Sequence, residues 1–139
     1  MNQTKLFDGI EHLSIAAKDP KALARWYCNN FGFEIIYEKP KTLETFVKLG
    51  ASIIEIDEAA NVERKHSGDR DPGLRHIGIS VKDIHKAYEH LKTKGVSLRS
   101  EPEEDRNQGQ WTVFIEDPEK NLVQLIQRYR SFEDRQRSS

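Results

Sequence analysis

The sequence predicts an α+β domain in which two tandem βαβββ modules form a curved mixed sheet. Two observations predict this fold. The segment EHLSIAAKD at 11–19 is similar to RHIGISVKD at 75–83, and their histidines are 64 residues apart (76 − 12). Each half then closes on an apolar strand with one polar interruption, SIIEIDE at 52–58 and NLVQLIQ at 121–127. Similarity at a fixed spacing within one chain is the signature of a repeated structural unit.

The first module is predicted over residues 8–57. Apolar and polar residues alternate over 10–17, which is typical of a half-buried strand. Asp19 is a suitable N-cap and Pro20 suits the first helical position, so a helix begins here, and Gly32 is a natural stop. Three strands are expected after the helix, over 33–38, 43–50 and 51–57.

The second module, residues 74–127, follows the same order. Asp83 caps a helix whose apolar residues recur at helical spacing, and Gly95 ends it. The turn 117–120, Asp-Pro-Glu-Lys, separates the last two strands. The strands expected after this helix are 96–100, 111–116 and 121–127.

The remaining segments complete one domain over residues 1–139. Residues 58–73 are polar and charged, and they are predicted to be a linker or a flap over a site. The charged tail, 128–139, is expected to fray unless Tyr129 and Phe132 dock on the domain.

Composition excludes several classes of function. The chain has 22 basic and 23 acidic residues and a net charge of −1, so no basic excess indicates a nucleic acid or an anionic membrane as partner. The single cysteine, Cys28, lies in a helical pattern and is interpreted as a packing residue. The first residues show no signal peptide and no apolar run is long enough to span a membrane, so a cytoplasmic location is expected.

Four polar side chains interrupt the apolar strands at matching places in the two modules. Side chains alternate across a strand, so the face opposite the apolar residues carries each of them. Imidazole nitrogens and carboxylate or amide oxygens are ligands for divalent transition metals, and such a set leaves positions open for substrate. The sequence therefore predicts a metal-containing cavity inside the sheet, with the ligands His12, Glu55, His76 and Gln124.

Taken singly, each of these residues has an ordinary structural explanation. A strand histidine is usually hydrogen-bonded to protein, and a glutamate among isoleucines can protect a sheet edge. Their joint placement favours the metal site, because an isolated buried carboxylate at Glu55 would be costly without a cation. The other histidines, His66, His85 and His90, are interpreted as solvated or packing residues, and no phosphate-binding loop, zinc-finger cysteine pair or nucleophile elbow is present in the sequence.

These features resemble the vicinal-oxygen-chelate superfamily, which includes glyoxalase I, methylmalonyl-CoA epimerase, extradiol dioxygenases, fosfomycin-resistance thiol transferases and bleomycin-sequestering proteins. The resemblance covers about residues 8–127, and FIEDPEKNLVQLIQ at 114–127 is similar to the characteristic ending of the family. It implies a divalent metal (zinc, nickel, cobalt, manganese or iron), a small substrate that chelates it through adjacent oxygens, and a homodimer.

The resemblance also implies roles for the four ligands. The fourth position is usually glutamate in glyoxalase I and the epimerase, and here it is Gln124. An amide cannot take up a proton, so Glu55 is the only carboxylate in the set that can act as the catalytic base. Phe46 and Trp111 are further candidates for the pocket, although core packing is the favoured interpretation of Trp111.

Three functions are compatible with this pattern. The first is a metal-dependent lyase or isomerase of the glyoxalase or epimerase kind, indicated by Glu55 beside the two histidines. The second is another metal-dependent activity on the same fold, either ring-cleaving dioxygenation or thiol transfer. The third is a protein that sequesters a small molecule without metal, as bleomycin-resistance proteins do.

Overall fold

A computed structural model describes residues 6–41, 43–61, 63 and 70–138 of the chain. Two compact units make up the molecule, Met1–Val62 and Glu63–Ser139, and each contains one sheet and at least one helix. Sheets of four and five strands with few helices confirm the α+β prediction. No helix in the described ranges is long and apolar enough to cross a membrane.

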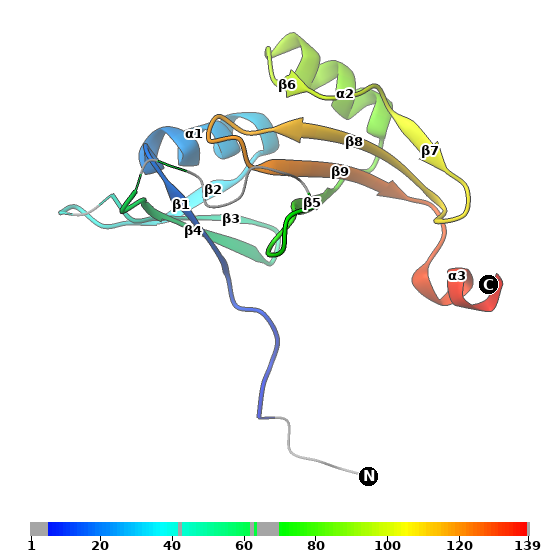
Figure 1. Ribbon diagram of the computed structural model, residues 1–139, viewed down its shortest axis with the longest axis horizontal. Coiled ribbons are helices and arrows are strands. Elements are labelled where there is room, and N and C mark those ends of the chain that lie inside the picture. The colour runs from blue at the N-terminus through cyan, green and yellow to red at the C-terminus, as the bar shows by residue number, and fades with distance from the viewer. Residues whose placement is uncertain (1–5, 42, 62, 64–69, 139) are drawn as a thin grey trace. The chain divides into compact units, whose positions relative to one another are not determined.

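The first unit is a four-stranded sheet with one helix packed on it (Figure 1). The strand order is β1-β4-β3-β2; β1 and β4 run parallel, and the other neighbours run antiparallel. Its elements are β1 (Leu13–Ala17), α1 (Pro20–Phe31), β2 (Glu34–Glu38), β3 (Thr45–Leu49) and β4 (Ser52–Glu58).

Capping residues at both ends determine where helix α1 begins and ends. The Asp19 carboxylate accepts a hydrogen bond from the Ala22 N–H at 3.0 Å, and Pro20 occupies the first turn, where its missing N–H costs nothing. Gly32 has φ = 80°, a left-handed conformation that glycine adopts without a steric penalty, and its N–H bonds to the Cys28 carbonyl. The helix buries its apolar stripe against β3 and β4. The core of this unit includes Leu23, Ala24, Tyr27, Val47, Ile54 and Ile56.

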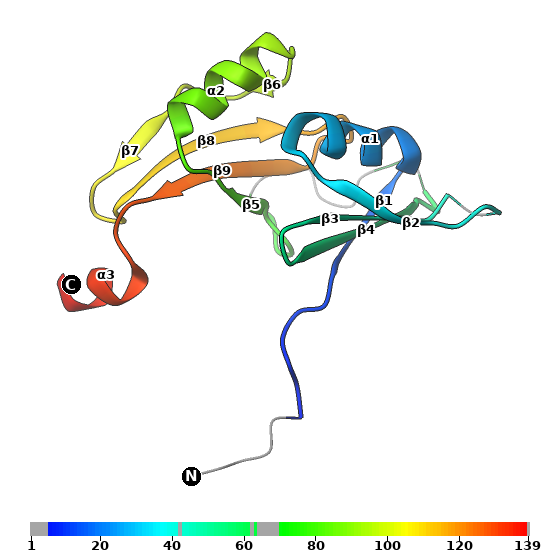
Figure 2. The same ribbon diagram turned by 180° about the vertical axis from the view of Figure 1, so that it is seen from behind.

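The second unit is a five-stranded sheet in the order β5-β9-β8-β6, with β7 also pairing with β8. Helix α2 lies over β8 and β9, as both views show (Figures 1 and 2). Its elements are β5 (Ile77–Ser80), α2 (Ile84–Thr93), β6 (Ser97–Leu98), β7 (Glu103–Asp105), β8 (Gln110–Glu116), β9 (Leu122–Arg128) and α3 (Phe132–Ser138).

Two side chains accept hydrogen bonds from the first turn of α2. The Asp83 carboxylate accepts from the Lys86 N–H at 3.1 Å and caps the helix. The Gln127 side-chain oxygen accepts from the Ile84 N–H at 2.8 Å, which joins the first turn of the helix to β9. The buried residues beneath the helix include Ile84, Leu91, Val113, Ile115, Val123 and Leu125.

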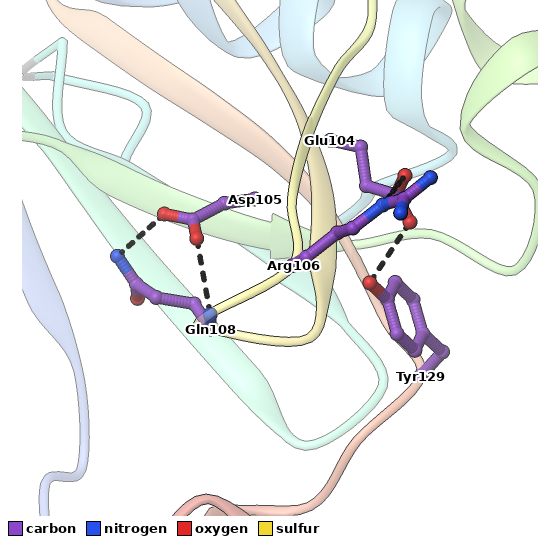
Figure 3. Close-up of polar contacts among 5 residues, drawn as sticks. All are labelled: Glu104, Asp105, Arg106, Gln108 and Tyr129. Atoms are coloured by element: carbon purple, nitrogen blue, oxygen red, sulfur yellow. Dashed lines mark hydrogen bonds and ion pairs between the residues drawn. The ribbon is translucent and has the colours of Figure 1, made fainter. Parts of the chain in front are cut away.

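Strand β7 is absent from the sequence prediction. Its residues Glu103–Asp105 are all acidic, so no apolar alternation marks them, and they are extended because they pair with β8. The Asp105 carboxylate then accepts from the Gln108 backbone N–H at 3.0 Å and from its side-chain amide at 3.2 Å, which shapes the turn into β8 (Figure 3).

The tail forms helix α3 rather than fraying over its whole length, and one of its two aromatic residues, Tyr129, bonds to the rest of the second unit. The Tyr129 hydroxyl donates to Glu104 at 2.9 Å, a bond that raises the pKa of the phenol (Figure 3). The Arg128 guanidinium lies 4.1 Å from the centre of the Phe132 ring. Residues 62 and 64–69 of the expected linker, with His66, lie outside the described residues, so the flap stays a prediction.

Candidate metal centre

Strand alternation gives the first unit one face under α1 and one open face. Ile15, Ile54 and Ile56 are buried on the helix side. Ser14 pairs with Glu55 across β1 and β4, and Phe46 pairs with Glu55 across β3 and β4. Cross-strand partners project to the same side of a sheet, so these residues share the open face. The predicted facing of Glu55 is therefore confirmed.

His12 and Glu55 meet at this open face. The His12 Nε2 atom lies 3.8 Å from a Glu55 carboxylate oxygen, and their side chains are 36% and 21% exposed. A metal ion sits about 2.0–2.1 Å from nitrogen or oxygen ligands, so two donors less than about 4 Å apart can hold the same ion. The Phe46 ring lies edge-on to the imidazole, with centroids 5.9 Å apart. The pair thus has the separation and the donor chemistry of two metal ligands.

Glu11 fixes which imidazole nitrogen can bind a metal. Its carboxylate lies 2.7 Å from His12 Nδ1. A carboxylate only accepts hydrogen bonds, so Nδ1 carries the proton and the lone pair of the neutral ring is on Nε2, the atom that faces Glu55. A carboxylate behind a histidine is a common arrangement at metal sites, where it orients the ring and raises its basicity.

Replacing Glu11 by glutamine should weaken metal binding by up to about tenfold, at the lower end of the effect of such partners because Glu11 is exposed. The measurement is the dissociation constant for zinc, determined by competition with a chelating dye. The control is Glu58→Gln, which removes the same charge from an exposed position at the end of β4. Equal weakening by both variants would show a general charge effect and remove Glu11 from the site.

The second unit presents His76 and Gln124 in the same manner. Gly78 pairs with Gln124 across β5 and β9, and Phe114 pairs with Gln124 across β8 and β9. A Cβ atom added at Gly78 would lie 3.8 Å from the Gln124 amide oxygen, so the absence of a side chain leaves room for the amide. His76 comes two residues before Gly78, and its ring lies edge-on to Phe114 at 5.6 Å. Both predicted ligands therefore share one face of this sheet.

The four predicted ligands form two pairs, one in each unit. Within the part of the chain that the structure describes, no group of three or more His, Cys, Asp or Glu side chains is arranged to hold a metal ion. A complete ligand set would have to draw on both pairs, and joint coordination by all four stays a prediction.

The described residues that were predicted to have solvated or packing roles are found in such places. His85 and His90 are exposed on α2, and Trp111 packs edge-on against the His85 ring at 4.9 Å, on the helix-covered face. Burial, followed by the charge of Glu34, raises the pKa of the Cys28 thiol, which disfavours the nucleophilic thiolate.

Two features near the predicted ligands were not identified from the sequence. The first is the side chain of Glu11. The second is a cavity of about 270 Å³ in the second unit, whose lining includes Arg75, Arg99 and Phe114. The repeat carried a signal for both, since Glu11 and Arg75 occupy the same place before the two histidines. A charged residue directly before each of the two predicted histidine ligands was therefore visible in the alignment of the two halves.

Comparison with known families matches residues 9–125 to the Glyoxalase/Bleomycin resistance protein/Dioxygenase superfamily. Among curated proteins, a "Probable lactoylglutathione lyase" of Synechocystis is 25% identical over 121 residues, which cover 84% of this chain and 92% of that protein.

Solved structures show the same fold. A glyoxalase family protein from Enterococcus faecalis superimposes with a TM-score of 0.75 at 25% identity, covering 88% of this chain and 99% of that one. A mutant of the fosfomycin resistance protein FosX from Listeria monocytogenes superimposes with a TM-score of 0.75 at 18% identity, covering 95% and 99%. That FosX structure holds Mn(II) and 1S,2S-dihydroxypropylphosphonic acid.

Proposed function

The chain belongs to the Glyoxalase/Bleomycin resistance protein/Dioxygenase superfamily, and from this premise we propose that it is a metal-dependent lyase or isomerase of the glyoxalase I or epimerase type. Its substrate is a small molecule that chelates the metal through adjacent oxygens, such as a hydroxyketone or a hemithioacetal. The observation that carries the proposal is the His12–Glu55 pair, in which a nitrogen and a carboxylate oxygen face each other at 3.8 Å.

The side chains present fit a divalent metal. Two imidazoles, one carboxylate and one amide oxygen are donors that zinc, nickel, cobalt, manganese and iron accept. The residues that would hold the ion are His12, Glu55, His76 and Gln124. When bound, such a metal acts as a Lewis acid that polarises the oxygens of the substrate.

The protein's own groups supply the proton chemistry. Glu55 takes the proton from the carbon beside the chelating oxygens, because it is the only member of the set that combines a metal-binding oxygen with a carboxylate base. Glu11 holds the His12 ring in the required tautomer. Phe46 lies edge-on to the His12 ring and opposite Glu55 across β3 and β4.

The metal content of the purified protein tests this proposal. The untagged protein should hold close to one equivalent of a transition metal by mass spectrometry, and the double variant His12→Ala/His76→Ala should hold almost none. The matched control is His85→Ala/His90→Ala, which removes two exposed histidines from α2 and should leave the metal in place. Circular dichroism confirms that each variant is folded.

The identity of the metal separates the functions that the sequence leaves open. Nickel, cobalt or zinc directs the search to isomerase chemistry, iron to ring-cleaving oxygenation, and manganese to the chemistry of FosX-like proteins. If the folded protein takes up no metal even after reloading, the proposal is wrong. A protein that binds small molecules without metal then becomes the first candidate. The homodimer expected from the sequence stays a prediction.

A further inference from the structure

We propose that the cavity beside Phe114 binds an anionic group of the substrate, a carboxylate or a phosphate. The cavity has a volume of about 270 Å³ and lies entirely within the second unit. That volume suits one part of a small ligand rather than the whole of a large one. Its lining residues are Arg75, Arg99, Ser100, Glu103, Phe114 and Leu122.

The strand register places this cavity next to the predicted ligand Gln124. Gln124 pairs with Phe114 across β9 and β8, and the Arg99 N–H donates to the Phe114 carbonyl at 2.9 Å. Gln124, Phe114 and Arg99 therefore stand in one row on the same face of the sheet. Neighbouring strands are about 4.8 Å apart, so the backbones of Gln124 and Arg99 are separated by roughly 10 Å. A ligand whose metal-chelating oxygens lie beside Gln124 can extend over the Phe114 ring and place its anionic group at Arg99.

The two arginines are positioned to recognise a negative group. The Arg75 guanidinium lies 5.8 Å from the centre of the Phe114 ring, which holds its charge beside the cavity floor. Arg99 Nε lies 3.4 Å from a Glu116 oxygen, and the two side chains are 40% and 33% exposed. Such an exposed ion pair contributes little, whereas a planar guanidinium binds carboxylates and phosphates through paired hydrogen bonds. A ligand anion can therefore compete with Glu116 for the Arg99 guanidinium.

The other lining residues indicate what kind of ligand the cavity can bind. Phe114 and Leu122 provide an apolar floor for a carbon skeleton. The lining contains two arginines and one carboxylate, that of Glu103, so its formal net charge is +1. Removing Glu103 should therefore strengthen anion binding, whereas removing either arginine should weaken it.

The test is an NMR titration of the metal-free protein at an ionic strength of about 0.1 M, where charges are screened beyond roughly 10 Å. The probes are benzoate, phenyl phosphate and the neutral isostere benzamide. Benzoate or phenyl phosphate should shift the resonances of Phe114 and Leu122, and benzamide should bind at least about tenfold more weakly. Comparing benzoate with phenyl phosphate shows which anion the cavity prefers.

The variants identify the groups responsible. Arg75→Gln and Arg99→Gln should each weaken binding of the preferred anion by about tenfold, and Glu103→Gln should strengthen it about two- to fivefold. The control is Arg106→Gln, which removes the same charge from a side chain that is 88% exposed and outside the cavity, and it should change nothing. Thermal unfolding confirms that the variants are folded.

Two results would overturn this inference: failure of both benzoate and phenyl phosphate to bind the wild-type protein, or equal binding of the preferred anion by the wild type and the arginine variants. That the anion belongs to the substrate rests on the proposed function, but the titration does not, since it uses no metal. If the protein holds metal but binds neither anion, only the proposed anion site is overturned. If it binds the anion through Arg99 but holds no metal, only the proposed metal-dependent activity is overturned.

Discussion

Glu55→Gln is expected to lower the rate of carbon–hydrogen exchange by about 10²–10⁴-fold, the usual contribution of a positioned general base. The amide keeps the shape and an oxygen donor, but it cannot take up a proton at neutral pH. The measurement follows the loss of the carbon-bound proton signal of hydroxyketones or hemithioacetals in D₂O by NMR. This readout records proton abstraction directly, whatever the later fate of the substrate.

A neighbouring carboxylate provides the control for Glu55. Asp57 lies two residues further along β4 on the same face, and it is also half-buried. Asp57→Asn removes the same charge and should change the exchange rate by less than about tenfold, because a nearby charge alone acts only through solvent. If Glu55→Gln retains its metal and exchanges the proton within tenfold of the wild type, Glu55 is not the base.

Asp117→Ala is expected to destabilise the second unit by about 3 kcal/mol, because it leaves several donors in a tight turn without their acceptor. Asp117 is 4% exposed. Its carboxylate accepts from the backbone N–H groups of Glu119 and Asn121, each at 2.9 Å, and from the Asn121 side chain at 2.9 Å. The free energy of unfolding from urea titrations measures the loss.

Asparagine at the same place separates hydrogen bonding from packing. Asp117→Asn keeps one oxygen for the two backbone donors and loses the acceptor of the Asn121 amide, so a loss of about 1–2 kcal/mol is expected. The turn leads into β9, which carries Gln124, so metal affinity should fall with stability in Asp117→Ala. An alanine variant as stable as the wild type would show that the β8–β9 turn does not need this carboxylate.

The sequence repeat alone predicts most of the fold. The caps Asp19 and Asp83 and the stop at Gly32 are local signals, because each acts through its own backbone or that of the next turn. Strand alternation also determined that Glu55 and Gln124 face away from the helices, since a strand with one buried face has only one possible facing.

Features that depend on contacts between segments distant in the sequence were not predicted. Strand β7 has no apolar pattern and is a strand only because β8 lies beside it. The tail is joined to β7 by the hydrogen bond from Tyr129 to Glu104, a contact over 25 residues that no local pattern signals. Cross-strand contacts depend on register, and register is a property of the paired strands together.

The sequence by itself determined which residue types could bind a metal and on which faces of their strands they stand. Only the tertiary structure decided that His12 Nε2 faces Glu55 at 3.8 Å, that Glu11 fixes the imidazole tautomer, and that Phe114 separates Gln124 from Arg99. The physical reason is that periodicity and capping act within a few residues, whereas distances between side chains are set by the pairing of strands far apart along the chain.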